Sequence, residues 1–204
     1  MKITSRNGSA AFTLIELMAV ITIIFILASL VVGGMGFVSE RQNKEKAKVQ
    51  IALLSKALEE YKLDMGIYPQ TENTATGLLQ TEELYQVLFY EGYDYVKNNA
   101  PTDWKKTING VDFPKSTKIY LADLDPTSTK QGWVKSAATV PTRIKKIVDP
   151  WGNEYGYRTA TNARNTPNTD TQNPDFDLWS SGKDGKTKAG IPTDKTNRDD
   201  IRNF

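Results

Sequence analysis

The side chains able to do chemistry in this sequence are carboxylates, amines and hydroxyls, because the chain contains no histidine and no cysteine. Histidine is the commonest general base and metal ligand in proteins, so its absence lowers the expectation of an enzyme. Without cysteine there is no disulfide framework. Two acidic features remain as candidates: an isolated carboxylate, Glu16, and a C-terminal set formed by Asp184, Asp199 and Asp200.

Glu16 stands at the front edge of a long apolar run. No charged residue occurs from Leu17 to Val38, and that span is long enough to cross a bilayer as a helix. The preceding residues 1–11 carry Lys2 and Arg6 and no acid, which favours an N-terminus held on the inner side of the membrane. A carboxylate at membrane depth is costly, so Glu16 is expected to pair with a cation.

The C-terminal acids form the one plausible metal constellation in the sequence. A hard cation such as calcium needs several oxygens gathered from a loop, which Asp184, Asp199 and Asp200 would supply in part. Their spacing does not match the EF-hand loop. The alternative is that Asp184, which precedes Gly185, belongs to a turn, and that the terminal Asp pair is solvated. Both interpretations stay open on the residues alone.

An amphipathic helix is predicted over residues 39–65, as a continuation of the apolar run. Apolar residues recur at three- and four-residue steps, and Gly66 and Pro69 mark the end of the pattern. The combined helix would be about 50 residues long, roughly 75 Å, which is too long for one small domain to bury. Its apolar half is therefore expected to be covered by lipid or by neighbouring copies. The stripe predicted to pack on a small sheet is Val49, Leu53, Leu54, Ala57, Leu58 and Tyr61.

Strand patterns are clearest near the C-terminus. The run from Asp149 to Asn153 predicts a tight turn, and residues 155–158 and 176–181 alternate as strands do, with a polar loop at 159–175 between them. Trp151 and Trp179 are predicted at the core or its edge.

Residues 81–142 are interpreted as an insertion, either a surface loop region or a partner-binding face, with the surface loop favoured. Within it, residues 82–90 fit a short helix with Leu84, Val87 and Leu88 facing inward.

The charge distribution argues against a nucleic-acid binder. The 204-residue chain has a formal net charge of +2, and Lys2 and Arg6 account for both units, which leaves the remainder near neutral. A nucleic-acid binder would show a concentrated basic face instead.

The segment Ala11-Phe12-Thr13-Leu14-Ile15-Glu16-Leu17 resembles the processing site of type IV pilin-like proteins. The resemblance implies that a membrane peptidase cuts between Ala11 and Phe12 and methylates the new terminus at Phe12. It also implies that Glu16 pairs with the N-terminus of a neighbouring subunit. The chain departs from the usual pattern in having Ala11 where glycine is common before the cut, and Gly33-Gly34 near the place where proline is frequent.

Two further segments narrow the resemblance. Tyr61-Lys62-Leu63-Asp64 followed by Tyr68-Pro69, together with Asp149-Pro150-Trp151-Gly152-Asn153, is similar to the major pseudopilin of type II secretion systems. The implied fold is α+β and pilin-like: a long N-terminal helix, membrane-spanning then amphipathic, packed on a small antiparallel sheet with a loop-rich C-terminal region. The family also holds calcium, which implies ligands at Asp184, Asp199, Asp200 and the backbone carbonyl of Ser181.

The resemblance divides the chain into four parts. These are a cleaved leader (residues 1–11), a polymerisation helix (12–38), its amphipathic continuation (39–65) and a soluble periplasmic domain (66–204). It implies a structural subunit rather than an enzyme, anchored once in a bacterial inner membrane. The subunit would polymerise into a periplasmic pseudopilus that supports type II secretion. Its implied partners are copies of itself, minor pseudopilins, the inner-membrane assembly platform and the prepilin peptidase, with no nucleic acid.

Two alternatives remain on the sequence. A type IV pilus subunit, major or minor, would share the helix, although such proteins often carry a cysteine pair that this chain lacks. An uncleaved, signal-anchored periplasmic binding module would keep residues 1–11 and work as a monomer.

Overall fold

The computed structural model describes residues 13–70, 78–79, 81–98, 105–108, 111–127, 132–136, 145–161, 166–188 and 190–204. Of these, residues 32–35, 78–79, 98, 105–108, 111, 113, 114 and 136 are described by their backbone alone. The chain separates into two compact units, Met1–Gln42 and Asn43–Phe204. The predicted leader and Phe12 lie outside the described residues.

Helix α1 (Leu14–Met65) runs through 52 residues without interruption. No proline occurs in it, and its end is the one predicted: Gly66 takes a φ of 79° and its N–H donates to the carbonyl of Lys62 at 2.8 Å. A glycine in this left-handed conformation is a common helix terminator because it lacks a Cβ.

The part of α1 within Asn43–Phe204 buries one stripe at three- and four-residue steps. Its buried apolar members are Ala47, Ile51, Leu54, Ala57, Leu58 and Tyr61. The predicted stripe is therefore right from Leu53 onward, with Leu53 partly buried against the core. The prediction is wrong for Val49, whose side chain is 59% exposed. Val49 lies two residues from both Ala47 and Ile51, which places it on the opposite side of a helix with 3.6 residues per turn.

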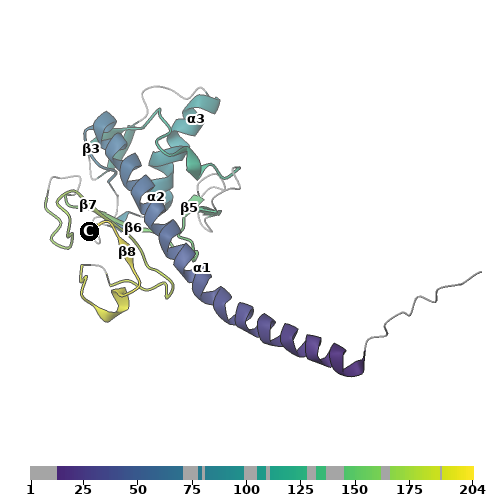
Figure 1. Cartoon of the computed structure of the whole chain (residues 1–204). Helices are drawn as coiled ribbons and strands as arrows, with labels where there is room; N and C mark the ends of the chain where they lie inside the picture. Colours follow the sequence, from purple (N-terminus) through teal and green to yellow (C-terminus); the bar gives the residue numbers. More distant parts are fainter. Residues whose placement is uncertain are drawn as a thin grey trace, which may run out of the picture. The chain divides into compact units, whose positions relative to one another are not determined.

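A four-stranded antiparallel sheet with the order β1-β6-β7-β8 forms the C-terminal part of the fold (Figure 1). Its strands are β1 (Leu78–Leu79), β6 (Gly156–Thr159), β7 (Phe176–Ser180) and β8 (Ile201–Arg202). The two predicted strands are confirmed as β6 and β7, which pair with Tyr157 opposite Leu178. All five residues of β7 are buried, including Trp179 at its predicted place in the core.

Two short hairpins complete the described strands. Strand β2 (Lys105–Ile108) pairs with β3 (Val111–Pro114), and β4 (Val134–Ser136) pairs with β5 (Lys145–Ile147). Trp133, just before β4, is 2% exposed, so this hairpin is attached to the core.

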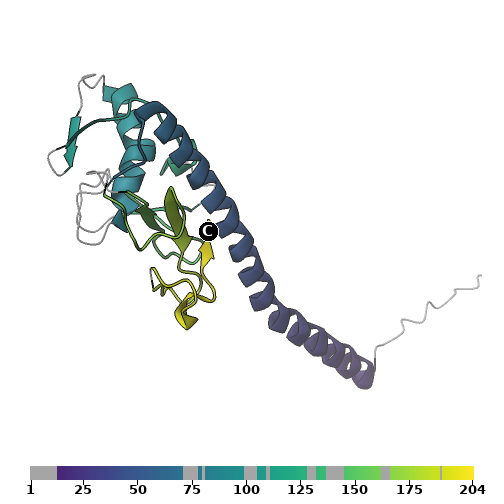
Figure 2. The same ribbon diagram turned by 90° about the vertical axis from the view of Figure 1, so that its left-hand side faces the viewer.

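Helix α2 (Thr81–Tyr85), the π-helical turn η1 (Gln86–Tyr90) and helix α3 (Glu91–Asn98) follow one another beside the C-terminal part of α1 (Figure 1, Figure 2). The inward positions predicted at Leu84, Val87 and Leu88 are confirmed, since all three side chains are buried. The surface-loop interpretation is wrong for residues 81–98, because they form helices and the apolar side chains of residues 84–89 are buried in one core with residues of α1 and of the 120–124 turn.

The segment at residues 116–124 docks on this helical stretch through backbone contacts. The Leu88 carbonyl, in the π-helical turn η1, accepts N–H bonds from Tyr120 at 2.9 Å and from Leu121 at 3.2 Å. Gly92 permits the close approach, since a Cβ at this position would lie 2.3 Å from the carbonyl carbon of Lys118. The buried Glu91 carboxylate accepts from the N–H of Ser116 at 3.0 Å.

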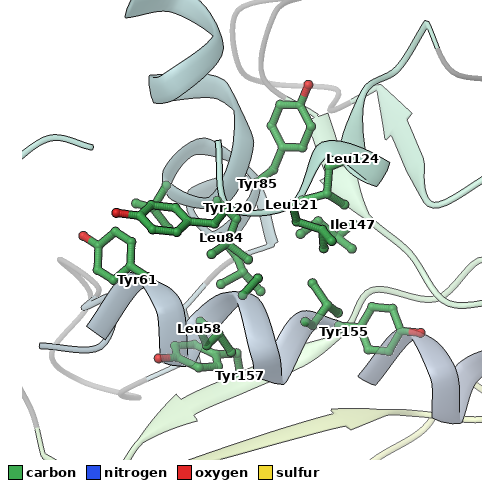
Figure 3. Packing of buried hydrophobic residues seen from close by; sticks show 14 of the residues in the cluster. Leu58, Tyr61, Leu84, Tyr85, Tyr120, Leu121, Leu124, Ile147, Tyr155 and Tyr157 are labelled. Atoms are coloured by element: carbon green, nitrogen blue, oxygen red, sulfur yellow. The ribbon is translucent and has the colours of Figure 1, made fainter. Parts of the chain in front are cut away.

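The core joins side chains from α1, α2, the 120–124 turn and the sheet in one cluster (Figure 3). Tyr61 and Tyr120 meet edge to face with ring centroids 5.3 Å apart. Tyr157 is fully buried, its hydroxyl donates to the carbonyl of Pro69 at 3.3 Å, and burial raises its pKa well above the ordinary tyrosine value. The predicted packing of the helix stripe on the C-terminal strands is therefore confirmed.

Candidate functional site

The N-terminal part of α1 carries no charged residue from Leu17 to Val38 and is largely apolar. Its large side chains are exposed, with Leu14 and Ile15 each 77% exposed. Among the described residues, α1 is the one helix whose length and apolar composition suit a membrane span. Burying apolar surface is worth about 25 cal/mol per Å². This stretch therefore has a large driving force to enter lipid or to pack against other apolar helices.

Glu16 lies in the first turn of α1, where Thr13 caps the helix. The N–H of Glu16 donates to the Thr13 carbonyl at 3.1 Å and lies 3.4 Å from the Thr13 hydroxyl, which in turn lies 3.5 Å from the Glu16 carboxylate. A Thr followed three residues later by Glu is a capping-box sequence, and a negative charge is favoured at the N-terminal end of a helix. The capping contacts leave Glu16 exposed and without a cation among the described residues up to Gln42.

The predicted processing residues Ala11 and Phe12 lie outside the described residues. Glu16 is therefore the one predicted residue of the N-terminal site whose surroundings the structure gives.

The predicted metal residues lie in or next to one loop, residues 181–200, here called the acidic loop, which connects β7 to β8. The N–H of Asp184 donates to Asp199 Oδ2 at 3.0 Å, so these two residues meet across the loop. The Asp184 carboxylate itself accepts from the N–H of Lys186 at 2.8 Å, in the manner of the turn that its neighbour Gly185 suggested. The carbonyl of Ser181 lies at the start of the loop, directly after β7.

Asp200 faces the interior. Its side chain is fully buried, and Oδ2 accepts from the hydroxyl of Thr187 at 3.1 Å and lies 3.5 Å from the guanidinium of Arg202. Oδ1 is buried and has no hydrogen-bond partner among the described residues. Burial raises the pKa of Asp200 to about 6, the charges of Asp199 and Asp184 add to the rise, and Thr187 and Arg202 oppose it.

The three acids are near one another but do not form a ready cage. In the described part of the chain, no group of three or more His, Cys, Asp or Glu side chains gathers at metal-ligand spacing. The Asp184 carboxylate is turned toward a backbone N–H, and Asp200 is turned inward. The unpaired, buried Oδ1 of Asp200 still fits a hard cation, since a buried carboxylate oxygen without a partner is costly.

The residues that shape the rest of the acidic loop were not predicted. Asn197 donates to the carbonyls of Lys188 and Ile191 and accepts from the N–H of Lys188, all within 2.9 Å. Arg202 donates to the carbonyls of Pro192 and Asn197. One of these elements has a recognisable sequence pattern, an Asx turn in which Asp194 stands two residues before Thr196. The Asp194 side chain accepts from the N–H of Thr196 and caps the short helix η3 (Lys195–Asn197).

The predicted turn at Asp149 to Asn153 is confirmed and lies against the acidic loop. The N–H of Gly152 donates to the carbonyl of Asp149 at 2.9 Å. The buried Asp149 carboxylate accepts from the N–H of Trp151 and of Asn153 through one oxygen, and from the hydroxyl of Ser180 at 2.6 Å through the other. This arrangement fixes the end of β7 relative to the turn.

Comparison with known protein families gives two matches. The family model described as "Type II secretion system (T2SS), protein G" matches residues 37–109, and the model described as "Prokaryotic N-terminal methylation motif" matches residues 6–32. The second match includes Ala11, Phe12 and Glu16. The first includes residues 81–109, which belong to the stretch interpreted as an insertion.

Two relatives and one solved structure align with most of the chain. A type II secretion system core protein G from Escherichia coli K12 is 30% identical over 95% of this chain and 93% of its own length. One from Pseudomonas aeruginosa is 29% identical over 89% of this chain and 88% of its own. The crystal structure of the major pseudopilin from the type 2 secretion system of enterohaemorrhagic Escherichia coli aligns with a TM-score of 0.41 at 20% identity, over 83% of this chain and 93% of that one.

The match to the Escherichia coli K12 protein extends over nearly the whole of both sequences, so it includes the N-terminal helix and the C-terminal sheet alike. On this evidence the chain belongs to the family of the type II secretion system core protein G, the major pseudopilins.

Proposed function

We propose that the chain polymerises through residues 12–38 of its N-terminal helix into a periplasmic filament. As a member of its family, the chain is a structural subunit of the pseudopilus of type II secretion. The observation that carries the assembly mechanism is the combination of an apolar helix exposed on all sides with a single carboxylate at its start. Side-by-side packing of such helices would bury the apolar surface.

Glu16 sets the register of this packing by pairing with the amine of a neighbouring subunit. A carboxylate beside apolar side chains needs a cation, and the chain offers none from Leu17 to Val38. Cleavage between Ala11 and Phe12 frees an amine at the required depth. The match of the methylation motif to residues 6–32 supports this processing.

The processed chain is expected to begin at N-methylated Phe12. Intact-mass and N-terminal peptide mass spectrometry of protein purified from its native membrane would measure this start. The control is protein produced without the prepilin peptidase, which should retain Met1. An intact Met1 in native membranes would contradict the proposal and would favour an uncleaved signal anchor.

The proposed topology is a single pass through the bacterial inner membrane, with residues 66–204 in the periplasm. Lys2 and Arg6 in the leader support this orientation by the positive-inside rule. The proposed partners are copies of the same chain, minor pseudopilins, the inner-membrane assembly platform and the prepilin peptidase. No enzymatic role is proposed for the chain.

We also propose that the acidic loop binds calcium through Asp184, Asp199, Asp200 and the backbone carbonyl of Ser181. The unpaired, buried Oδ1 of Asp200 supports this, because a divalent cation would satisfy it. The nearness of Asp199 and Asp184, which disfavours the charged form of Asp200, supports it as well. The ion would supply positive charge and join the start of the acidic loop to its end.

Calcium is expected to raise the melting temperature of the purified chain above its value in chelator. A ligand present at 100 times its Kd stabilises the folded state by about 2.7 kcal/mol, which corresponds to several degrees for a protein of this size. The measurement is a thermal melt in calcium, in magnesium and in chelator. Magnesium is the control, because it demands a tighter octahedral geometry. Equal melting temperatures in calcium and chelator would refute the site.

A further inference from the structure

We propose that Asn153 is a positioning residue for the acidic loop: it holds the peptide of Gly182 so that the end of β7 and Asp199 stay in contact. The inference rests on the calcium site proposed above, and it assigns to the turn at residues 149–153 the task of shaping that site. Asn153 would not touch the ion.

Gly182 is held through both its backbone carbonyl and its backbone N–H. The Nδ2 of Asn153 donates to the Gly182 carbonyl at 2.7 Å, and the N–H of Gly182 donates to Ser180 Oγ at 3.1 Å. The hydroxyl of Ser180 donates in turn to the buried carboxylate of Asp149 at 2.6 Å. Since Asp149 also binds the N–H of Asn153, these contacts form a closed ring.

Gly182 lies directly against Asp199. It has a φ of 62°, and a Cβ at this position would lie 2.4 Å from the Asp199 carbonyl oxygen and 2.6 Å from Asp199 Oδ2. The same Oδ2 accepts the N–H of Asp184. Gly182 therefore packs against Asp199, which in turn binds the backbone of Asp184.

The other end of the Asn153 side chain limits the loop as well. Its Oδ1 lies 2.9 Å from the place where a Cβ on Gly185 would be, and Gly185 has a φ of 66°. Asn153 thus touches the loop on both sides of Asp184. The hydrogen bond from the Asn153 side chain to Gly182 joins the acidic loop to a segment 29 residues earlier in the chain.

The test uses the full-length chain in detergent, with the variant N153A and the matched control N173A. Asn173 is also half-buried and also donates its amide to backbone carbonyls, those of Phe176 and Asn203, but it makes these bonds away from the acidic loop. Two measurements are made on each protein: calcium affinity by titration calorimetry, and amide hydrogen exchange of residues 182–186 in chelator.

N153A is expected to weaken calcium binding about fivefold or more and to speed amide exchange at residues 182–186 by a similar factor, the effect of losing one hydrogen bond. N173A is expected to keep both values. If N153A does not fold, N153D replaces it, because this variant keeps the side-chain shape and loses the donor.

The two readouts separate the claims. Unchanged exchange in N153A overturns the positioning role, and faster exchange with unchanged calcium affinity overturns its connection to the ion. If the wild-type chain binds no calcium, the proposed metal site fails, and the exchange measurement in chelator still decides whether Asn153 holds the loop.

Discussion

Replacing Glu16 with Gln is expected to abolish filament assembly while leaving the chain inserted in the membrane. The variant keeps the size of the side chain and removes its charge, so the amine at Phe12 of a neighbouring subunit would lose its partner within an apolar layer. Removing one member of a buried ion pair costs about 3–5 kcal/mol. That cost recurs at every subunit contact, which is why the effect should be a loss of filaments rather than a reduction.

Filaments would be measured by electron microscopy of sheared material, and insertion by resistance to alkaline extraction. The matched control is T22A, which removes another polar group from the apolar part of the same helix. The Thr22 hydroxyl donates to the carbonyl of Met18 within the helix, so its loss should change neither result. Normal filaments from the Glu16→Gln chain would refute the register role.

Replacing Gly92 with Ala is expected to destabilise the domain by about 3 kcal/mol, at the upper end of the usual cost of overpacking. The added methyl would lie 2.3 to 2.6 Å from the backbone of Lys118 and Ile119, and backbone atoms give way less than the end of a flexible side chain. Relief requires α3 to move away from residues 118–119. This movement would also strain the bond between Glu91 and the N–H of Ser116.

Urea unfolding of the full-length chain in detergent, followed by tryptophan fluorescence, measures this change. V96A is the control in the same helix, because Val96 is 65% exposed and its truncation should cost less than about 0.5 kcal/mol. Equal midpoints for the Gly92→Ala chain and the wild type would show that α3 and residues 118–119 are not packed as described.

Features encoded by neighbouring residues could be predicted from the sequence. The uncharged run, the three- and four-residue steps of α1 and the glycine at its end are local signals, and the structure follows them. The turn at Asp149 and the alternation in β6 and β7 are local as well. The error at Val49 arose because an apolar residue was assigned to the stripe by its type rather than by its angular position.

Features that depend on distant contacts could not be predicted in the same way. Helical spacing predicted that Leu84, Val87 and Leu88 face inward, but it did not predict which segment packs there, because Tyr120 and Leu121 reach the Leu88 carbonyl from about thirty residues later in the chain. The acidic loop is similar: its residues suggested a metal site, whereas its shape depends on an amide from Asn153. Short sequence patterns carry no record of such pairings.

The single carbonyl of Leu88 has a consequence for protein engineering. Because it accepts from the N–H groups of both Tyr120 and Leu121, the helical stretch at residues 81–98 and the segment at residues 116–124 should be exchanged together in any chimera. A chimera that exchanges either segment alone with a related subunit would keep these backbone groups but would mismatch the side chains of Leu84, Leu88 and Leu121, which pack in the same core. Exchange of residues 81–124 as a whole keeps the pairing and moves the β2–β3 hairpin with it.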